Sequence, residues 1–167
     1  MITETDLAWA AGIIDGEGCI LLGRWKARNR PGSTYRLSVL VTNTSFMMLH
    51  RLREIFGVGF ITPRRAALKH HKPQWSWHVS CSEAELVLRA VEPYIVAKRD
   101  ETRLGILSRQ YILGRNTAAK RGGNPHGEKL EWLKRQLSSL KHNPDPTDSA
   151  KLALPDVGLP LFEKREA

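Results

Sequence analysis

Cysteine and long apolar stretches are both scarce in this chain of 167 residues. The two cysteines, Cys19 and Cys81, lie far apart and match no zinc-ligand spacing, so we expect neither a disulfide framework nor a structural zinc site. No apolar run approaches the roughly 18 residues of a membrane span. A secretion signal has Lys or Arg before its apolar stretch, and neither precedes the first apolar stretch of this chain. These absences predict a soluble, unsecreted protein that works inside the cell without a membrane partner.

Acidic residues are scarce over a long central part of the chain. Residues 19–81 hold eleven Lys and Arg and one acid, Glu54, for a net charge of +10. Residues 1–18 have the opposite character, with four acids and no Lys or Arg, and residues 82–167 carry +3 of the total of +9. Because 41% of the residues are hydrophobic, the chain is expected to fold, and its basic excess favours a polyanionic partner.

The first expected helix spans about residues 7–15, with Thr5 or Asp6 as its cap. Small or acidic residues recur on one face of it at helical spacing: Ala8, Ala11, Gly12 and Asp15. Because small side chains allow a second backbone to approach closely, we expect this stripe to form an interface with another helix. The alternative interpretation is that the stripe packs inside its own chain.

Two hairpins, each followed by a helix, are expected next, before further helices. In chain order the predicted elements are strands 19–27 and 34–43 around a turn at 29–33, helix 45–56, strands 59–64 and 74–81 around a basic loop at 65–73, helices 83–92 and 98–113, a linker over 114–123, and a helix from 124–125 to 142. This order predicts the α+β class, with an antiparallel sheet in an α-β-β-α-β-β-α arrangement and extra C-terminal helices. One domain is expected over residues 1–142, followed by a proline-containing tail over 143–167.

In strand 34–43, apolar residues alternate with polar ones, so one face is expected to pack on a core while the other stays free. Together with the basic charge, this pattern predicts a nucleic-acid-binding surface. The residues assigned to it are Arg24, Lys26, Arg28, Arg30, Arg36, Ser38, Thr42, Arg64, Arg65, Lys69, Gln74, Ser76 and His78.

The side of the first strand on which Arg24, Lys26 and Arg28 lie is open, because all three share strand parity with the apolar Ile20 and Leu22. Either the strand extends beyond the core and these side chains reach phosphates, or a bulge reverses the face and the side chains enter the nucleic-acid groove to contact bases. Trp75 and Trp77 are assigned to the core.

The segment from 10 to 18, Ala-Ala-Gly-Ile-Ile-Asp-Gly-Glu-Gly, places two acids and two glycines at the end of the first helix. Two such helices packed side by side would bring carboxylates together, which is costly unless a cation lies between them. Hard oxygen ligands, here the Glu17 carboxylate and the Gly16 carbonyl, favour Mg²⁺, with Mn²⁺ as a substitute.

These nine residues resemble the LAGLIDADG motif of homing endonucleases. They match it at Ala11, Gly12, Asp15 and Gly18, and with the same or a similar residue at Ile13, Ile14 and Glu17. The expected order of elements resembles the same family over residues 7 to about 113. The sequence departs from the motif at Ala10, where Leu is usual, and at Glu17, where Asp is common. The motif occurs once, which in this family implies a homodimer.

The resemblance implies roles for particular residues. Glu17 and Gly16 correspond to metal ligands, Lys98 to a lysine near the scissile phosphate, and Asn43 to a polar residue that positions water. The dimer interface corresponds to the small-residue stripe, with Asp15 in a structural role.

The implied activity is Mg²⁺-dependent hydrolysis of both strands of double-stranded DNA at a long, nearly palindromic target, by a homodimer encoded within an intron or intein. The expected location is the cytoplasm and nucleoid, or an organelle that carries the host element. Two alternatives remain: a non-cleaving DNA- or RNA-binding protein of the same fold, such as a maturase or a regulator, and a general basic RNA-binding protein.

Overall fold

The computed structural model describes residues 2–26, 33–64, 72–113 and 124–142. The elements in chain order are α1 (Glu4–Glu17), β1 (Gly18–Lys26), β2 (Ser33–Asn43), α2 (Phe46–Phe56), β3 (Phe60–Arg64), β4 (Gln74–Ser80), α3 (Ser82–Val91), the 3-10 helix η1 (Glu92–Tyr94), α4 (Arg99–Leu113) and α5 (Gly127–His142). The predicted α+β class and the α-β-β-α-β-β-α order with additional C-terminal helices are confirmed.

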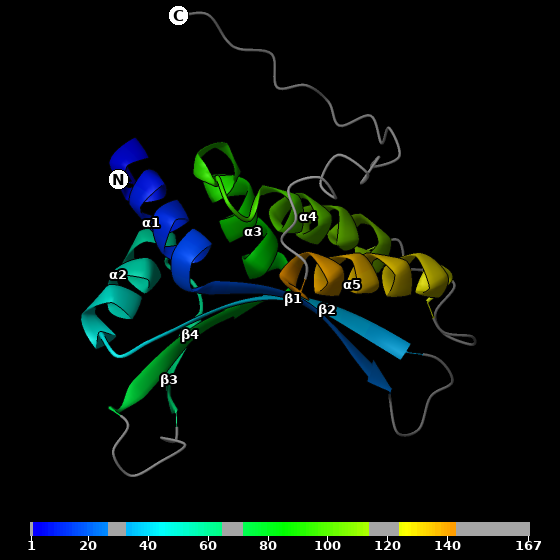
Figure 1. Ribbon diagram of the computed structural model, residues 1–167, viewed down its shortest axis with the longest axis horizontal. Coiled ribbons are helices and arrows are strands. Elements are labelled where there is room, and N and C mark those ends of the chain that lie inside the picture. The colour runs from blue at the N-terminus through cyan, green and yellow to red at the C-terminus, as the bar shows by residue number, and fades with distance from the viewer. Residues whose placement is uncertain (1, 27–32, 65–71, 114–123, 143–167) are drawn as a thin grey trace, which may run out of the picture.

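The four strands form one sheet in the order β1-β2-β4-β3, and every neighbouring pair is antiparallel. All the helices lie on one side of this sheet (Figure 1), with α2 and α3 packed against β4 and with α4 and α5 packed against β1. No helix of the described residues lies on the opposite side, which we call the open face. This two-layer arrangement leaves one sheet surface available for a ligand.

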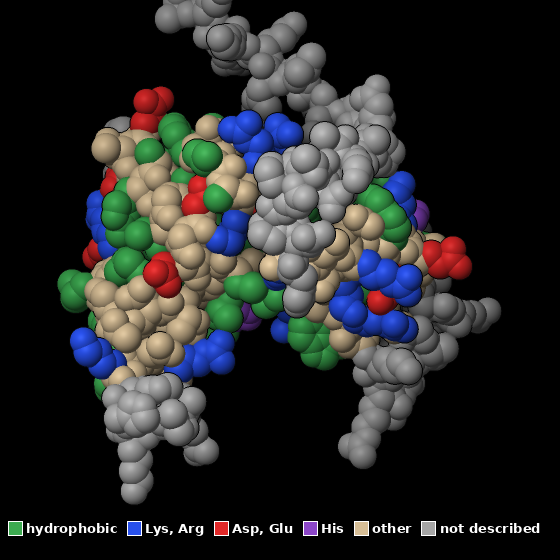
Figure 2. Space-filling view, viewed as in Figure 1, with side chains coloured by type: hydrophobic (Ala, Val, Ile, Leu, Met, Phe, Trp, Pro, Cys, Tyr) green, Lys and Arg blue, Asp and Glu red, His purple; other side chains and the backbone are tan. Residues whose placement is uncertain are grey.

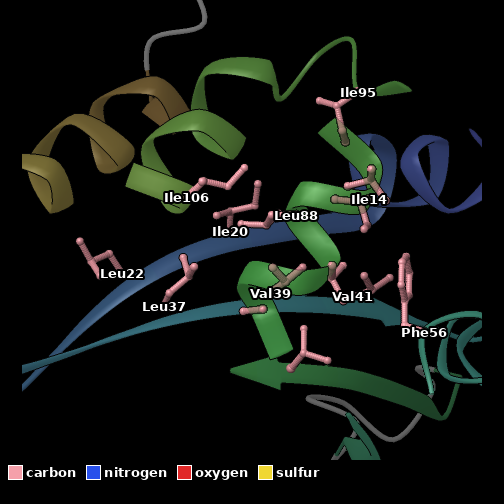
Figure 3. Close-up of a cluster of buried hydrophobic side chains, with 14 of the residues drawn as sticks. Ile14, Ile20, Leu22, Leu37, Val39, Val41, Phe56, Leu88, Ile95 and Ile106 are labelled. Carbon is pink, nitrogen blue, oxygen red and sulfur yellow. The ribbon is translucent and has the colours of Figure 1, made fainter. Parts of the chain in front are cut away.

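The core lies between the sheet and the helices. Figure 3 shows Ile14 of α1, Ile20 of β1, Val39 of β2 and Leu88 of α3 converging there, all of them almost completely buried. Trp77 is fully buried on the same side, as its parity predicted, and its ring nitrogen donates to the Val58 carbonyl at 3.1 Å. The alternation of β2 places Leu37, Val39 and Val41 in this core, as the predicted one-sided packing of this strand requires.

The helix α1 begins three residues earlier than predicted. Its cap is Thr3, whose side chain accepts from the Asp6 backbone, while the Asp6 carboxylate accepts from the Thr3 backbone. This reciprocal capping box satisfies two otherwise unpaired backbone donors, so the helix does not start at Thr5 or Asp6.

The pairing of β1 with β2 continues in one register from Gly18 opposite Val41 to Lys26 opposite Ser33, without a bulge. Arg24 therefore stays on the helix side with Ile20 and Leu22. The register therefore excludes the bulge alternative for Arg24 and Lys26, whereas Arg28 lies outside the described residues.

Among the described residues, none of the helices combines the length and apolar character needed to cross a bilayer. The predicted linker 114–123 and tail 143–167, and most of the predicted turn 29–33 and basic loop 65–73, lie outside the described residues.

Candidate nucleic-acid interface and helix-end site

The end of α1 and the start of β1 meet without an intervening loop. Gly18 follows the helix directly and opens the strand, and its backbone N–H donates to the Ile14 carbonyl. A Cβ at position 18 would collide with the Ile14 backbone, so this close approach requires glycine. The φ of Gly18 is −81°, which any residue adopts, so the close approach, and not the backbone angle, is what requires glycine. Glu17 therefore lies at the border between helix and sheet.

The Asp15 carboxylate binds the segment that joins η1 to α4. Its Oδ2 accepts backbone N–H groups from Val96 at 2.7 Å and Ala97 at 3.2 Å, and its Oδ1 accepts that of Lys98 at 2.9 Å. The Lys98 ammonium donates in return to the Asp15 backbone carbonyl. We call this set of bonds the Asp15 clamp. It holds a segment 81–83 residues away in sequence at the end of α1 and brings Lys98 next to the segment that carries Gly16 and Glu17.

Gly16 and Glu17 are both exposed. Within the described residues, no group of three or more His, Cys, Asp or Glu side chains is placed to hold a metal ion. One chain therefore offers a carboxylate and an adjoining carbonyl, which are oxygen donors of the kind Mg²⁺ prefers but fewer than the roughly six of its coordination shell. These residues fit part of a magnesium site that needs further oxygens from a second chain, a phosphate or water.

Asn43 lies at the end of β2, two residues beyond Val41, which pairs with Gly18. This register brings Asn43 close to the end of α1. Its Oδ1 accepts the Ser45 backbone N–H at 2.8 Å, a turn that precedes α2. The water-positioning role assigned to Asn43 stays a prediction.

The small-residue stripe of α1 divides between two environments. Ala8 and Gly12 are exposed, whereas Ala11 is fully buried and Asp15 is committed to the clamp. Ala11 therefore has no exposed surface to give to a partner helix, and for it and Asp15 the alternative interpretation, packing within the chain, is correct. The exposed stripe of α1 is Thr5, Ala8, Trp9, Gly12 and Gly16.

The open face of the sheet carries seven of the thirteen predicted nucleic-acid-binding residues: Arg36, Ser38, Thr42, Arg64, Gln74, Ser76 and His78. They belong to three neighbouring strands, and strand alternation directs them all away from the core. Figure 2 shows blue Lys and Arg side chains on both sides of the hollow along the lower edge of the molecule, where the open face lies.

Arg24 does not belong to the open face. It is on the helix side, where its guanidinium donates to Ser33 at 2.8 Å and pairs with Glu131 of α5 at 3.4 Å. Glu131 also accepts from the Tyr35 hydroxyl at 2.9 Å, a bond that lowers the pKa of Glu131. Burial, and then this bond, raises the pKa of Tyr35. Arg24 thus links β1 to α5 and is a poor candidate for base reading.

The remaining predicted binding residues lie at the border of the described residues or outside them. Lys26 ends β1, and its side chain is outside the described part of the structure. The others outside the described residues are Arg28, Arg30, Arg65 and Lys69.

Several polar groups on the open face bind one another. The Thr42 and Ser76 hydroxyl oxygens are 2.7 Å apart, and the Arg64 Nε donates to the Ser76 oxygen at 2.8 Å. Burial lowers the pKa of His78, and Arg36 adds to the effect by like charge. The neutral imidazole is therefore favoured, so His78 can accept as well as donate a hydrogen bond.

Four residues that were not predicted to lie on this face also belong to it: Leu21, Trp25, Phe60 and Thr62. Phe60 pairs with His78, and their rings meet edge to face with centroids 5.0 Å apart. The signal that could have found Phe60 is strand parity, because it is two and four residues from Thr62 and Arg64.

No protein-family model matches the chain, and no curated protein matches it. Solved structures do match. The homing endonuclease I-CvuI, in complex with DNA in the presence of magnesium, is 19% identical, with 82% of each chain covered and a TM-score of 0.65. The archaeal intron-encoded homing endonuclease I-Vdi141I, complexed with DNA, is 14% identical, with 81% of this chain and 84% of that chain covered and a TM-score of 0.65.

The meganuclease I-SmaMI, bound to uncleavable DNA, is 18% identical, with a TM-score of 0.63. The match covers 77% of this chain but 43% of that one. The chain therefore has the LAGLIDADG homing endonuclease fold, as its resemblance to the motif implied.

We predict that Asp15→Asn loosens the segment from Val96 to Lys98. The amide keeps one acceptor oxygen but places an NH₂ donor against backbone donors, so we expect a loss of about 1–3 kcal/mol in the free energy of unfolding. Amide hydrogen exchange at the three clamped N–H groups should accelerate. The matched control is Glu17→Gln, an acid-to-amide change at an exposed position of the same helix end. Unchanged exchange in Asp15→Asn would contradict the clamp.

Proposed function

We propose that this chain, which has the LAGLIDADG homing endonuclease fold, is a sequence-specific endonuclease that hydrolyses phosphodiester bonds of double-stranded DNA at a long, nearly palindromic target. The observation that carries the proposal is the Asp15 clamp, which brings Lys98 next to the segment holding Glu17, where β1 of the open face begins. An acid and a cation brought together at the border of a basic surface are suited to phosphate chemistry.

The proposed active form is a homodimer that packs along the exposed stripe of α1. Gly12 and Gly16 support this, because each costs a helix roughly 1 kcal/mol relative to alanine. Apart from the adjoining residues and the backbone of α1 itself, no atom of the described residues would lie within 4 Å of a Cβ at either position, so no described contact requires glycine there. A close approach by a second helix would explain why both positions hold glycine. The half-length match to I-SmaMI is also what one subunit of a two-part nuclease would give.

In the proposed mechanism, the Glu17 carboxylates of the two copies meet at the two-fold axis, and with the Gly16 carbonyls they hold Mg²⁺, for which Mn²⁺ substitutes. A metal bound there would supply an activated water and polarise the scissile phosphate. Lys98 places a positive charge beside this site and stabilises the negative charge that develops on the phosphate. Asn43, near the helix end, positions water.

Target recognition in this proposal belongs to the open face. Arg36 and Arg64 pair with guanine edges or with phosphates, and Gln74 pairs with adenine, through the pattern that bases present in the major groove. Two sheets related by a two-fold axis would read two half-sites, which is why the target is expected to be nearly palindromic. We further propose that the protein is encoded within an intron or intein and acts in the compartment that holds its target DNA.

We predict that Glu17→Gln abolishes cleavage and largely preserves target binding, because the amide loses the charge that holds the metal but keeps the shape of the side chain. The measurement is a plasmid nicking and linearisation assay with Mg²⁺, using a library that contains the native insertion site, paired with a binding assay. Glu4→Gln is the control, since Glu4 is an exposed acid at the other end of α1.

Persistent cutting by Glu17→Gln would refute the metal assignment. If the unsubstituted protein binds its site in Mg²⁺ but never cleaves, the non-cleaving alternative, a maturase or regulator, replaces the proposal. Binding without sequence preference once salt is raised would instead indicate a general RNA-binding protein, because phosphate contacts weaken steeply with ionic strength.

We also predict that Gly12→Leu separates the dimer while leaving the subunit folded. The new side chain would project into open space in its own chain but would block the approach of a second helix. Sedimentation velocity should report a dimer for the unsubstituted protein and a monomer for Gly12→Leu, with equal circular dichroism. The control is Gly127→Leu on α5, where a Cβ likewise meets no described atom. A Gly12→Leu variant that dimerises as tightly as the unsubstituted protein would exclude α1 from the interface.

A further inference from the structure

The middle of the open face is apolar. Leu21 of β1 and Phe60 of β3 are 40% and 53% exposed, and the half-buried Leu40 of β2 lies between them in the sheet. Leu40 is paired with His78, which is paired in turn with Phe60. We call Leu21, Leu40 and Phe60 the central patch. Exposed leucine and phenylalanine on a sheet surface that has no helix over it invite an apolar ligand group.

The central patch lines an open hollow of about 690 Å³ that also involves Ser38, Ser76 and Arg64. Figure 2 shows green apolar side chains and a purple histidine in the hollow along the lower edge of the molecule, between blue side chains. The hollow is therefore apolar in its middle and positively charged toward its sides.

The polar groups around the central patch are largely occupied. Ser38 and Ser76 are buried, and Ser76 is bonded to both Thr42 and Arg64. Among the neighbours on this face, His78 keeps polar ring atoms and Thr62 keeps an exposed hydroxyl that can bond a ligand, and the lowered pKa of His78 favours its uncharged form. The middle of the face thus has little capacity to satisfy a polar base edge.

The positive charges at the borders of the open face indicate the class of ligand that the face would bind. Arg64 lies at the β3 end of the face, and Arg36 lies toward the β1–β2 end, with its guanidinium 5.0 Å from the centre of the Trp25 ring. An apolar floor between cationic borders is complementary to a nucleic-acid groove that presents apolar groups at its base and phosphates at its rims.

We propose that the central patch reads the 5-methyl groups of thymine in the major groove, so that each half-site of the target carries thymine opposite Leu21, Leu40 and Phe60. This inference rests on the proposed function and adds to it the chemical identity of the bases read at the middle of the sheet.

Thymine is favoured for a physical reason. Its C5-methyl is the apolar group that the major groove exposes, whereas cytosine presents an amino donor and guanine presents two acceptors. Against leucine and phenylalanine, those polar edges would lose water without gaining a partner, which costs binding free energy. A buried methyl group gains affinity by about fourfold, the equivalent of burying one carbon.

The test begins with selection of preferred duplexes from a randomised library by the full-length protein, with Ca²⁺ in place of Mg²⁺ to prevent cutting. Each thymine in the selected half-site is then replaced in turn by deoxyuridine, which lacks only the methyl group, and dissociation constants are measured at one fixed salt concentration. We expect about fourfold weaker binding at each position that faces the central patch, and restored affinity when 5-methylcytosine replaces cytosine there.

Protein variants locate the methyl contact. Phe60→Ala and Leu21→Ala remove exposed side chains and should leave the fold intact, which circular dichroism checks. Each should bind thymine and deoxyuridine duplexes equally at one position while keeping the difference at the others. The matched control is Leu86→Ala on α3, an exposed leucine in the helix layer, which should keep every thymine–deoxyuridine difference.

The inference is overturned if selected half-sites lack thymine at recurrent positions, if deoxyuridine binds as well as thymine at all of them, or if the loss is the same in both variants as in the unsubstituted protein. These outcomes leave DNA cleavage intact and so differ from failure of the proposed function. That failure would appear as selection of no sequence at all, or as no cleavage of the selected duplex when Mg²⁺ replaces Ca²⁺.

Discussion

The site at the end of α1 depends on one carboxylate, that of Asp15. It accepts three consecutive backbone N–H groups from residues 96–98, and the Lys98 side chain returns to the Asp15 carbonyl. Three donors on one carboxylate form a charge-assisted set that is stronger than neutral hydrogen bonds. Because these bonds join α1 to the segment before α4, the helix that ends at Glu17 and the loop that carries Lys98 are fixed relative to each other. Asp15 therefore holds the parts of the candidate site together, while Glu17, two residues further along the chain, stays exposed.

The basic residues on the two sides of the sheet also have different roles. On the helix side, Arg24 is held by Glu131 and Ser33, so this basic residue serves packing between β1 and α5. On the open face, Arg64 is steered by Ser76, and Arg36 lies over Trp25, so both cations are oriented by neighbours. Orientation before binding lowers the entropy lost when a ligand is bound, and this favours a specific over a purely electrostatic surface.

The sequence predicted the order of elements because its periodicities are local. The alternation in β2 and the parity of Trp77 identified core and open sides correctly. Contacts between distant segments were beyond such patterns: nothing within residues 10–18 shows that Asp15 binds residues 96–98. The side occupied by Arg24 needed the register of β1 on β2, and Ala11 lies on a helical face that the small-residue pattern could not assign to a partner or to the core. Phe60 was missed because β3 is short and contains a proline, which weakens its alternation.

The central claim is that two copies of this chain bring their α1 ends together on DNA, so that the Glu17 carboxylates share a metal site. Anomalous X-ray scattering from Mn²⁺ in crystals of the protein with its selected duplex tests this most directly. The account predicts manganese peaks at the two-fold axis, within coordination distance of Glu17 from both copies. Manganese bound elsewhere, or a complex with a single copy of the chain on the duplex, would contradict it.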